Sequence, residues 1–341
     1  MTLSKLTDVD PPVAPKVVPI SREAALSSSP SVVLGAEASP ITLPHTHCII
    51  RPQVPLARYT SYRVGGPAEW FVMPRTASEL AESIAWANTH SVPIMFLGAG
   101  SNLLISDHGL SGLIICTRHL RHSHFDPETA QVTVAAGEPL PSLAWKTAEL
   151  GWSGLEWAVG IPGTVGGAVV MNAGAHRSCI ADSLLNTQLI TQTGGEATLT
   201  VADLDYRYRT STLQGDMSRF VVQATFQLQP GYEPDAIATK THHHKAHRHR
   251  TQPYHLPSCG SVFRNPTPYA AGWLIEQTGL KGFQIGDAQV AERHANFILN
   301  CGKATSTDIL RLIHHIQEKV EQHWQQRLEP EVKILGKFEI A

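Results

Sequence analysis

One stretch of the sequence decides the interpretation of the fold: Gly160-Ile161-Pro162-Gly163-Thr164-Val165-Gly166-Gly167-Ala168, which continues to Asn172-Ala173-Gly174-Ala175. Its small residues are dense enough to lie against one flat ligand. Glycine has a high conformational entropy in the unfolded chain, so a cluster of this density usually has a steric reason. The alternative explanation is a tight turn.

A second glycine loop, Gly98-Ala99-Gly100-Ser101-Asn102, follows a short apolar strand predicted at 93–97. Glycines let backbone N–H groups approach a phosphate, and the serine and asparagine add donors. The loop is not the dinucleotide fingerprint, because position 103 is Leu where a third glycine is needed. It is not a Walker loop either, because no lysine follows. A turn remains the alternative for this loop alone, but the two loops together favour a bound dinucleotide.

Hydrophobic periodicity on either side of these loops predicts two regions that differ in secondary structure. The first is βαβ-like: strands at 68–72 and 93–97 flank a helix that begins at the capping box Thr76-Ala77-Ser78-Glu79. The second is rich in strands. It has a hairpin around Gly194-Gly195 and a strict alternation of apolar residues from Phe220 to Leu228.

After Pro230 the chain predicts a third region. A short helix is expected from Ala271 to Gly279, and a long one spans 307–324 with its apolar residues on one face. The segment 331–336 is predicted to be a strand that returns to a sheet formed earlier in the chain. The whole pattern is that of a mixed α/β (α+β) protein.

Length, charge and cysteine usage exclude several classes of protein. A chain of 341 residues is too long for one core and predicts two or three domains. A formal charge of −2 and the absence of a long apolar run give no reason to expect a nucleic-acid or membrane partner. The five cysteines are odd in number and form no C-x-x-C pair, which argues for a reducing compartment. We therefore expect a cytoplasmic protein.

The first residues, 1–44, differ in composition from the rest. Runs such as Pro11-Pro12-Val13-Ala14-Pro15 have neither helical nor strand period, and we interpret this segment as a disordered tail. The acids Asp8, Asp10 and Glu23, together with the lack of an apolar stretch followed by a cleavage pattern, argue against a signal peptide. A plastid transit peptide is an alternative that the same acids disfavour.

Three separate segments carry side chains suited to catalysis. Arg209 has a permanent charge that can hold negative charge as it forms. Ser261 follows Gly260, and its hydroxyl can give a proton when a neighbour stabilises the resulting charge. Glu331 can orient or protonate a carbonyl group if burial raises its pKa. The ordinary alternatives are a surface arginine, a capping serine and a solvated acid at a strand end.

A histidine-rich segment, 242–250, combines five histidines with Lys245, Arg248 and Arg250. His243 and His247 have the i, i+4 spacing of a helical metal-binding pair. No carboxylate or cysteine lies near them in the sequence. We therefore expect no metal, and interpret the segment as a solvated basic face that is suited to lie near an anionic substrate.

In their order along the chain, these motifs resemble those of the UDP-N-acetylenolpyruvoylglucosamine reductase family. The resemblance covers about 57–337, nearly everything after the tail. Besides the two glycine loops it rests on Thr60-Ser61-Tyr62-Arg63-Val64-Gly65-Gly66, Tyr208-Arg209-Thr210-Ser211, Gly260-Ser261-Val262-Phe263-Arg264-Asn265-Pro266, Gly279-Leu280-Lys281-Gly282, His294-Ala295-Asn296-Phe297 and Glu331-Val332.

The resemblance implies a fold and a cofactor. The fold would be the FAD-binding PCMH type with two subdomains, shared with some flavin oxidases, followed by an α+β substrate-binding domain. The implied boundaries are 45–118 with 329–341 returning to it, 119–229, and 230–328. FAD would bind non-covalently between the first two. The implied cofactor-binding residues are Gly98, Ala99, Gly100, Ser101, Asn102, Leu103, Pro162, Val165, Gly166, Gly167, Ala168, Asn172 and Gly174.

The resemblance also implies an activity. NADPH would be the co-substrate that reduces FAD, and UDP-N-acetylglucosamine enolpyruvate would then bind in the same place. Hydride transfer to the terminal enol carbon would leave an enolate held by Arg209 and Glu331. Ser261 would protonate the adjacent carbon, which gives UDP-N-acetylmuramate, a peptidoglycan precursor. Tyr208 and Asn265 would bind substrate, and the enzyme would act as a monomer.

The family resemblance leaves two choices to be made. Only eight residues separate Ser211 from Phe220, which indicates the shorter of two subtypes, without an insert that carries an extra substrate-clamping tyrosine. The Tyr-Arg-x-Ser spacing selects Arg209 rather than Arg207. Two other functions stay open: another FAD-dependent sugar or alcohol oxidase or dehydrogenase of the same fold, and a non-catalytic UDP-sugar binder.

Overall fold

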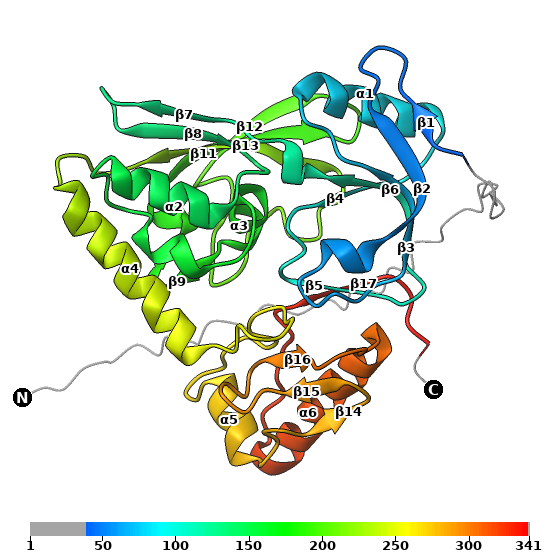
Figure 1. Ribbon diagram of the computed structural model, residues 1–341, viewed down its shortest axis with the longest axis vertical. Coiled ribbons are helices and arrows are strands. Elements are labelled where there is room, and N and C mark those ends of the chain that lie inside the picture. The colour runs from blue at the N-terminus through cyan, green and yellow to red at the C-terminus, as the bar shows by residue number, and fades with distance from the viewer. Residues whose placement is uncertain (1–38, 340–341) are drawn as a thin grey trace, which may run out of the picture. The chain divides into compact units, whose positions relative to one another are not determined.

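The first of three larger β-sheets has strands in the order β1-β2-β3-β6-β4 in this computed structural model, which describes residues 39–339 (Figure 1). β3 and β4 both pair in parallel with β6, so β6 lies between the two strands that helix α1 connects. The predicted βαβ unit is confirmed, and its two strands are not adjacent because β6 lies between them. The elements are β1 (Ile41–Thr42), β2 (Ile49–Pro55), η1 (Leu56–Tyr59), β3 (Pro67–Val72), α1 (Ala77–Thr89), β4 (Ile94–Leu97) and β6 (Leu110–Cys116).

The start of α1 follows the predicted capping motif. Thr76 is the N-cap, and its side chain accepts a hydrogen bond from the backbone N–H of Glu79 at 3.1 Å. The Glu79 carboxylate in turn accepts from the backbone N–H of Arg75 at 2.6 Å. Two N–H groups that the helix cannot satisfy internally are thereby paired.

Strand β1 corrects the predicted extent of the tail. Ile41 pairs with Ile50, and Leu43 is buried with 1% of its surface exposed. Both apolar side chains gain by leaving water, so the chain is ordered before residue 45. Their position directly after a Pro- and Ser-rich segment concealed them. The rest of the predicted tail, 1–38, lies outside the described residues.

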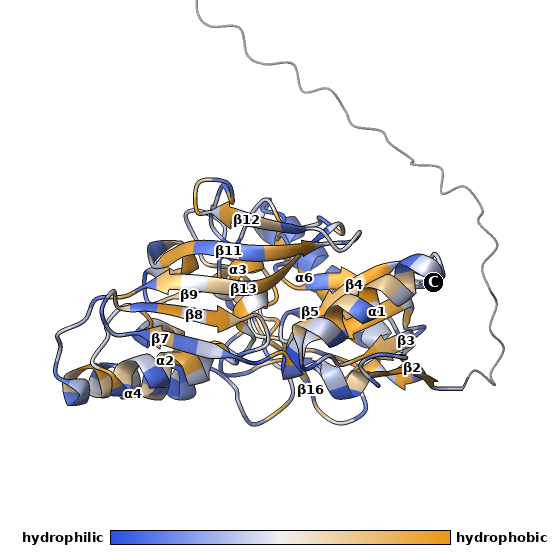
Figure 2. Cartoon of the chain, turned by 90° about the horizontal axis from the view of Figure 1, so that it is seen from above, coloured by the Kyte–Doolittle hydropathy of each residue, from blue (hydrophilic) through white to orange (hydrophobic). Residues whose placement is uncertain are grey.

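The second sheet is antiparallel throughout, with strands in the order β12-β11-β13-β8-β7. The predicted hairpin joins β11 to β12, and its turn contains Gly194 with φ +87°. Figure 2 shows hydrophobic stretches on β8, β11 and β13, interrupted on β11 by polar residues, and the buried side chains of these strands pack with α2 and α3 into one core. The elements are β7 (Ser123–Asp126), β8 (Gln131–Ala135), α2 (Leu140–Glu149), η3 (Glu156–Gly160), α3 (Val165–Met171), β9 (Gly174–Ala175), β10 (Ser178–Cys179), η4 (Ile180–Asp182), β11 (Leu184–Thr191), β12 (Glu196–Thr200) and β13 (Arg219–Gln227).

The third region contains helices α5 and α6 and a small antiparallel sheet in the order β14-β15-β16. Helix α6 presents the predicted apolar face, since Ile309, Ile313 and Ile316 are fully buried. Helix α4 leads into this region and buries only Ile237 and Thr241, which explains its hydrophilic sequence. The elements are α4 (Pro234–Thr251), α5 (Ala271–Gln277), β14 (Gln284–Ile285), β15 (Ala288–Val290), β16 (Ile298–Asn300) and α6 (Ser306–Trp324).

A strand pairing and a helix cap are among the contacts that join the third region to the first. Strand β17 (Lys333–Leu335) returns to the first region as predicted for the last segment, but it pairs in parallel with β5 (Leu103–Ile105) in a separate two-stranded sheet. The carboxylate of Asp107 accepts the backbone N–H groups at the start of α6, from Ser306 at 2.8 Å and Thr307 at 2.9 Å. Although burial raises the pKa of Asp107, these hydrogen bonds hold it below its usual value. Among residues 39–339, no helix is both long and apolar enough to cross a bilayer.

Candidate functional site

The structure brings the two glycine loops together. The Ser101 hydroxyl donates to the carbonyl oxygen of Pro162 at 2.8 Å. A Cβ added to Gly98 would lie 2.6 Å from Oγ1 of Thr164, so Thr164 packs where Gly98 has no side chain. The loops come from the first and the second region, and the absence of a side chain at position 98 lets them approach each other this closely.

The surface fits the diphosphate of a dinucleotide. No hydrogen bond among residues 39–339 uses the backbone N–H groups of Ala99, Gly100 or Ser101. In the same part of the chain, Oγ1 of Thr164 is buried and has no hydrogen-bond partner. Buried polar groups are nearly always paired in folded proteins, so an orphan hydroxyl beside three free N–H groups indicates an anionic ligand.

Other predicted cofactor residues serve the packing of α3. The N–H groups of Val165 and Gly166 donate to the carbonyl oxygens of Glu138 and Ala136, each at 2.9 Å. A Cβ on Gly166 would lie 2.8 Å from that of Ala136, so this glycine lets the helix approach the end of β8. These two N–H groups are therefore occupied within the fold. Of the remaining predicted residues in this helix, Ala168 is buried, whereas Gly167 is exposed.

Asn172 and Gly174 contact the segment that carries Arg209. Asn172 has φ +43°, and its side-chain amide donates to the carbonyl oxygen of Arg207 at 3.1 Å. The carbonyl oxygen of Gly174 accepts from Nη2 of Arg209 at 2.6 Å. The second glycine stretch therefore ends in a support for the predicted catalytic arginine.

Glu331 lies between the first glycine loop and the segment that carries Ser261. Its N–H donates to the carbonyl oxygen of Val262 at 2.7 Å, and its carbonyl oxygen accepts from the side chain of Asn102 at 3.1 Å. An isolated β-bridge between Phe263 and Pro330 continues the pairing. The side chain that was predicted to bind cofactor, Asn102, thus also fixes the chain at Glu331.

Arg209 reaches Glu331 from the second region. Its Nε lies 3.1 Å from Oε1 of Glu331, with 21% and 16% of the two side chains exposed. Arg209 has φ +54°, an unfavourable conformation for a non-glycine residue. Gln214 stabilises it by donating to the Arg209 carbonyl oxygen at 2.6 Å, and Arg264 donates to the same oxygen at 3.2 Å. The structure thus unites two of the three predicted catalytic side chains by an ion pair.

The electrostatics of this cluster favour an anionic ligand. Burial raises the pKa of Glu331 above its ordinary value, although the nearby Arg209, Arg264 and Lys333 act in the opposite direction. Burial also lowers the pKa of Lys333, whose ammonium donates to Gln214 at 2.8 Å. Burial outweighs the ion pair at Glu331 because the charged form loses more hydration than the cations return. Three cations surround one carboxyl group, so the site carries excess positive charge.

Sequence reasoning missed several residues of this cluster. Lys333 lies two positions after Glu331, and the period of a strand could have placed both on one face. Arg264 stood in a motif already noted, but its sequence gives no sign that it reaches the Arg209 backbone. Asn296 also stood in a motif already noted, but its role was not predicted: it is 2% exposed, and its amide binds both backbone groups of Phe263, at 2.9 and 2.8 Å.

The two predicted substrate-binding residues lie at the edge of the site. Tyr208 is 53% exposed, and the guanidinium carbon of Arg209 lies 5.0 Å from its ring centroid. Asn265 is exposed, and its side-chain oxygen accepts from the N–H of Ala271 at the start of α5 at 3.0 Å. Tyr208 is therefore free to meet a ligand, whereas one end of the Asn265 amide is already engaged.

The histidine-rich segment is helix α4, and its histidines meet another one from the β9–β10 turn. The rings of His176 and His244 lie 4.1 Å apart between centroids, and those of His176 and His247 lie 5.4 Å apart. Burial and the neighbouring cations lower the pKa of His176 to about 4. In the described part of the chain, no three His, Cys, Asp or Glu side chains are arranged to hold a metal ion.

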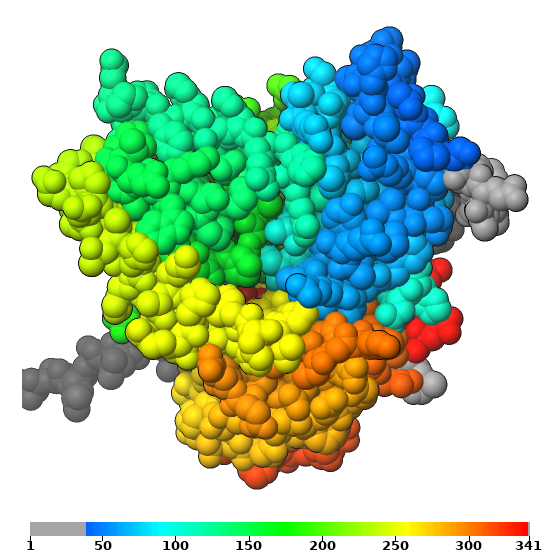
Figure 3. Space-filling view, in the orientation of Figure 1, coloured from blue at the N-terminus to red at the C-terminus, as the bar shows by residue number. Residues whose placement is uncertain are grey.

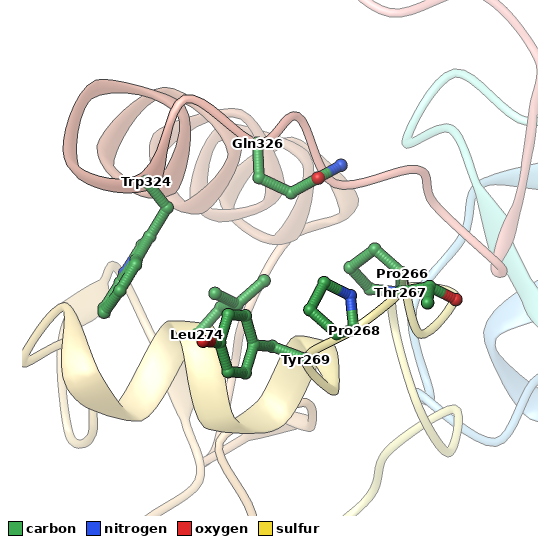
Figure 4. A pocket seen from close by; sticks show the side chains of 7 residues that line it. All are labelled: Pro266, Thr267, Pro268, Tyr269, Leu274, Trp324 and Gln326. Carbon is green, nitrogen blue, oxygen red and sulfur yellow. The ribbon is translucent and has the colours of Figure 1, made fainter.

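A cavity of about 160 Å³ between α5 and the end of α6 lies outside the catalytic cluster (Figure 4). The loop 266–269 lines it together with Leu274, Trp324 and Gln326. It contains none of the predicted catalytic or cofactor-binding residues. Figure 3 shows instead that the first region, the second region and the 250–260 segment meet on one face of the molecule.

Comparisons with known proteins identify the family of this chain. A family model described as an FAD binding domain matches residues 68–200, and one described as UDP-N-acetylenolpyruvoylglucosamine reductase, C-terminal domain, matches residues 252–335. Curated proteins named UDP-N-acetylenolpyruvoylglucosamine reductase are similar over most of their length. The Trichormus variabilis protein is 59% identical over 95% of this chain and 96% of its own. The Nostoc punctiforme protein is 61% identical over 88% and 90%.

A solved structure adds the three-dimensional likeness. The crystal structure of UDP-N-acetylenolpyruvylglucosamine reductase (MurB) from Thermus caldophilus matches with a TM-score of 0.71 and 33% identity. The match covers 84% of this chain and all of that one. The fold and the two-loop cradle define an FAD-dependent oxidoreductase. Within that class, the chain belongs to the UDP-N-acetylenolpyruvoylglucosamine reductase family.

Proposed function

We propose that Arg209, Glu331 and Ser261 carry out the proton and charge chemistry by which this enzyme reduces UDP-N-acetylglucosamine enolpyruvate to UDP-N-acetylmuramate, with NADPH as electron donor. The observation that carries the proposal is the convergence of three distant segments. Glu331 pairs through its backbone with Val262, next to Ser261, and through its side chain with Arg209.

The cofactor cradle is proposed to be the surface of the two glycine loops. The free N–H groups of Ala99, Gly100 and Ser101 and the orphan hydroxyl of Thr164 would hold the FAD diphosphate. When bound there, FAD accepts electrons from NADPH and supplies the hydride for the reduction. Because Asn102 joins this loop to Glu331, the cradle and the catalytic cluster are parts of one site.

Arg209 and Glu331 are proposed to hold the substrate carboxylate as its charge grows. Addition of a hydride to the terminal enol carbon moves an electron pair toward the carboxylate oxygens. A fixed guanidinium lowers the energy of that state more than it lowers the energy of the starting ether. Glu331 has a pKa raised by burial, so its protonated form can donate a hydrogen bond to the same oxygens. Arg264 and Lys333 add positive charge around the carboxylate.

Ser261 is proposed to protonate the carbon that bears the ether oxygen, which completes the lactyl group. Its hydroxyl makes no hydrogen bond among residues 39–339, so it is available to a ligand. Gly260, with φ +77° and open space where a Cβ would be, lets the chain turn directly before it. The cations around Glu331, which pairs with the next residue Val262, would favour the transient alkoxide that remains after the proton leaves.

The domain boundaries at 118/119, 229/230 and 328/329 are also proposed, and the three sheets follow this division. We further propose that the enzyme acts as a cytoplasmic monomer without a nucleic-acid or membrane partner. The neutral balance of charge is consistent with this. Size-exclusion chromatography with light scattering tests the monomer, which a mass of twice 37.1 kDa would contradict.

The function is tested by NADPH oxidation in the purified flavoprotein, with and without UDP-N-acetylglucosamine enolpyruvate. We expect oxidation that depends on this compound and a product whose mass is higher by two hydrogen atoms. Reduction of the bound flavin by a sugar or alcohol instead of NADPH would favour an oxidase or dehydrogenase of the same fold. Tight binding of the UDP-sugar without any turnover would favour a non-catalytic binder.

A further inference from the structure

Arg118 lies directly behind the first glycine loop. It belongs to η2 (Thr117–His119), which follows β6. Its Nη2 donates to the carbonyl oxygens of Tyr59 at 2.7 Å and Ala99 at 2.5 Å, and its Nε donates to that of Gly98 at 3.3 Å. One half-buried guanidinium therefore binds three backbone carbonyl groups, two of them from the loop itself.

These contacts determine which way the loop's peptide groups point. In a trans peptide the C=O and the N–H lie on opposite sides. Carbonyl groups of Gly98 and Ala99 that point toward Arg118 therefore turn the N–H groups of Ala99 and Gly100 away from it. Those are two of the three N–H groups that have no acceptor among residues 39–339. The arginine thus orients the donors of the cradle.

The charge of Arg118 is also uncompensated. No carboxylate of residues 39–339 lies within 4.0 Å of its guanidinium. Two other partly buried arginines have such a partner: Arg209 has Glu331, and Arg219 has Asp216. The Tyr59 ring, with its centroid 5.6 Å from the guanidinium carbon, supplies only a weak cation–π contact. Carbonyl groups satisfy the hydrogen bonds of the cation, but a net charge in low dielectric is best balanced by an anion.

We propose that Arg118 is a positioning residue for the cofactor diphosphate. Arg118 lies behind the loop, and its positive charge is balanced by the negative charge of the diphosphate. The inference rests on the proposed placement of the FAD diphosphate on this loop. It extends that placement to a residue outside both glycine motifs. Arg118 acts through the loop, by orienting its N–H groups, and through space, by its positive charge.

The inference predicts an effect that depends on the phosphates of the ligand. FAD carries the diphosphate, whereas riboflavin has the same isoalloxazine ring without any phosphate. We expect Arg118→Met to weaken FAD binding by about tenfold or more, the effect of losing one charge-assisted contact. Riboflavin binding should change by less than about twofold. Both affinities are measured by titrating the deflavinated protein and following flavin fluorescence.

A matched control removes the same charge without the contacts. Arg58 lies beside Tyr59, is exposed, and makes no hydrogen bond to the loop among residues 39–339. Arg58→Met should leave both affinities unchanged. Equal weakening of FAD and riboflavin by Arg118→Met would show a merely structural role and overturn the inference. If the Met variant does not fold, Arg118→Lys provides a second test, because lysine keeps the charge but cannot bind the three carbonyl groups. A ratio of FAD affinity to riboflavin affinity equal to that of the wild type would also overturn the inference.

Thr164→Val separates this inference from the proposal on which it rests. If the diphosphate lies on the loops, losing the orphan hydroxyl lowers the FAD-to-riboflavin affinity ratio. A ratio lowered by Thr164→Val but not by Arg118→Met would refute the role of Arg118 and leave the cradle in place. A ratio unchanged in both variants would refute the placement itself, and with it the inference.

Discussion

Asn296 supports the backbone of the Ser261 segment, and its replacement is the sharpest test of that arrangement. The segment pairs on one side with residues 329–331, through the N–H of Arg264 and the carbonyl oxygen of Val262. Phe263 therefore directs its own N–H and C=O to the other side, toward Asn296. The Asn296 amide supplies both missing partners, at 2.9 and 2.8 Å.

The change Asn296→Ala removes both partners and leaves two buried backbone groups unpaired. Each such group costs about 1–3 kcal/mol, so we expect the free energy of unfolding to fall by about 2–6 kcal/mol. The segment should also shift relative to Glu331, which slows the protonation step more than it slows FAD reduction by NADPH. Urea denaturation measures the first effect, and rapid-mixing kinetics of the two half-reactions measure the second.

Asn300→Ala is the matched control. Asn300 is 5% exposed, and its side chain binds Tyr62, Gly302 and Ala304, away from Ser261. We expect a comparable loss of stability with no change in the ratio of the two half-reaction rates. The reasoning is wrong if Asn296→Ala changes the unfolding free energy by less than about 0.5 kcal/mol, a shift typical of surface substitutions. It is also wrong if both variants change the rate ratio equally.

Two further predictions follow from buried groups of the site. The folded pKa of Glu331 is raised above 4.5, so the folded protein holds this proton more tightly, and the Glu331 contribution to stability falls as pH rises through the window above 4.5. Glu331→Gln should therefore gain stability relative to wild type between about pH 4 and pH 7. Urea denaturation across this range checks the sign, and a constant difference would contradict it. Thr164→Val should unfold no more easily than wild type without flavin, since it removes an unpaired buried hydroxyl that costs about 1–3 kcal/mol, yet bind FAD more weakly. Thermal denaturation with and without FAD tests both halves, and parallel shifts would count against the proposed cradle.

Local chemistry explains why much of the fold could be predicted. The cap at Thr76, the turn at Gly194 and the apolar face of α6 are each determined by residues close together in the sequence. Strand β1 could not be predicted, because two apolar residues after a polar tail give no periodic pattern. Its pairing with β2 depends on a partner strand that comes later in the chain.

The site shows the same division between local and distant information. The two glycine loops can be predicted from their composition. By contrast, Thr164, Arg118 and Asn296 act through contacts with segments far away in the sequence. Packing also gives some of the predicted cofactor-binding residues a structural role instead. The N–H groups of Val165 and Gly166 are consumed by neighbouring carbonyl groups, which no linear motif can indicate.

The proton-donor role of Ser261 is the central claim, and one comparison of half-reactions tests it most directly. Ser261→Ala is compared with Ser258→Ala, a serine three positions earlier that is also half-buried and whose hydroxyl makes no hydrogen bond among residues 39–339. We expect both variants to keep the rate of FAD reduction by NADPH. Only Ser261→Ala should slow product formation, by about a hundredfold or more. Product formation at the wild-type rate in Ser261→Ala would contradict the account.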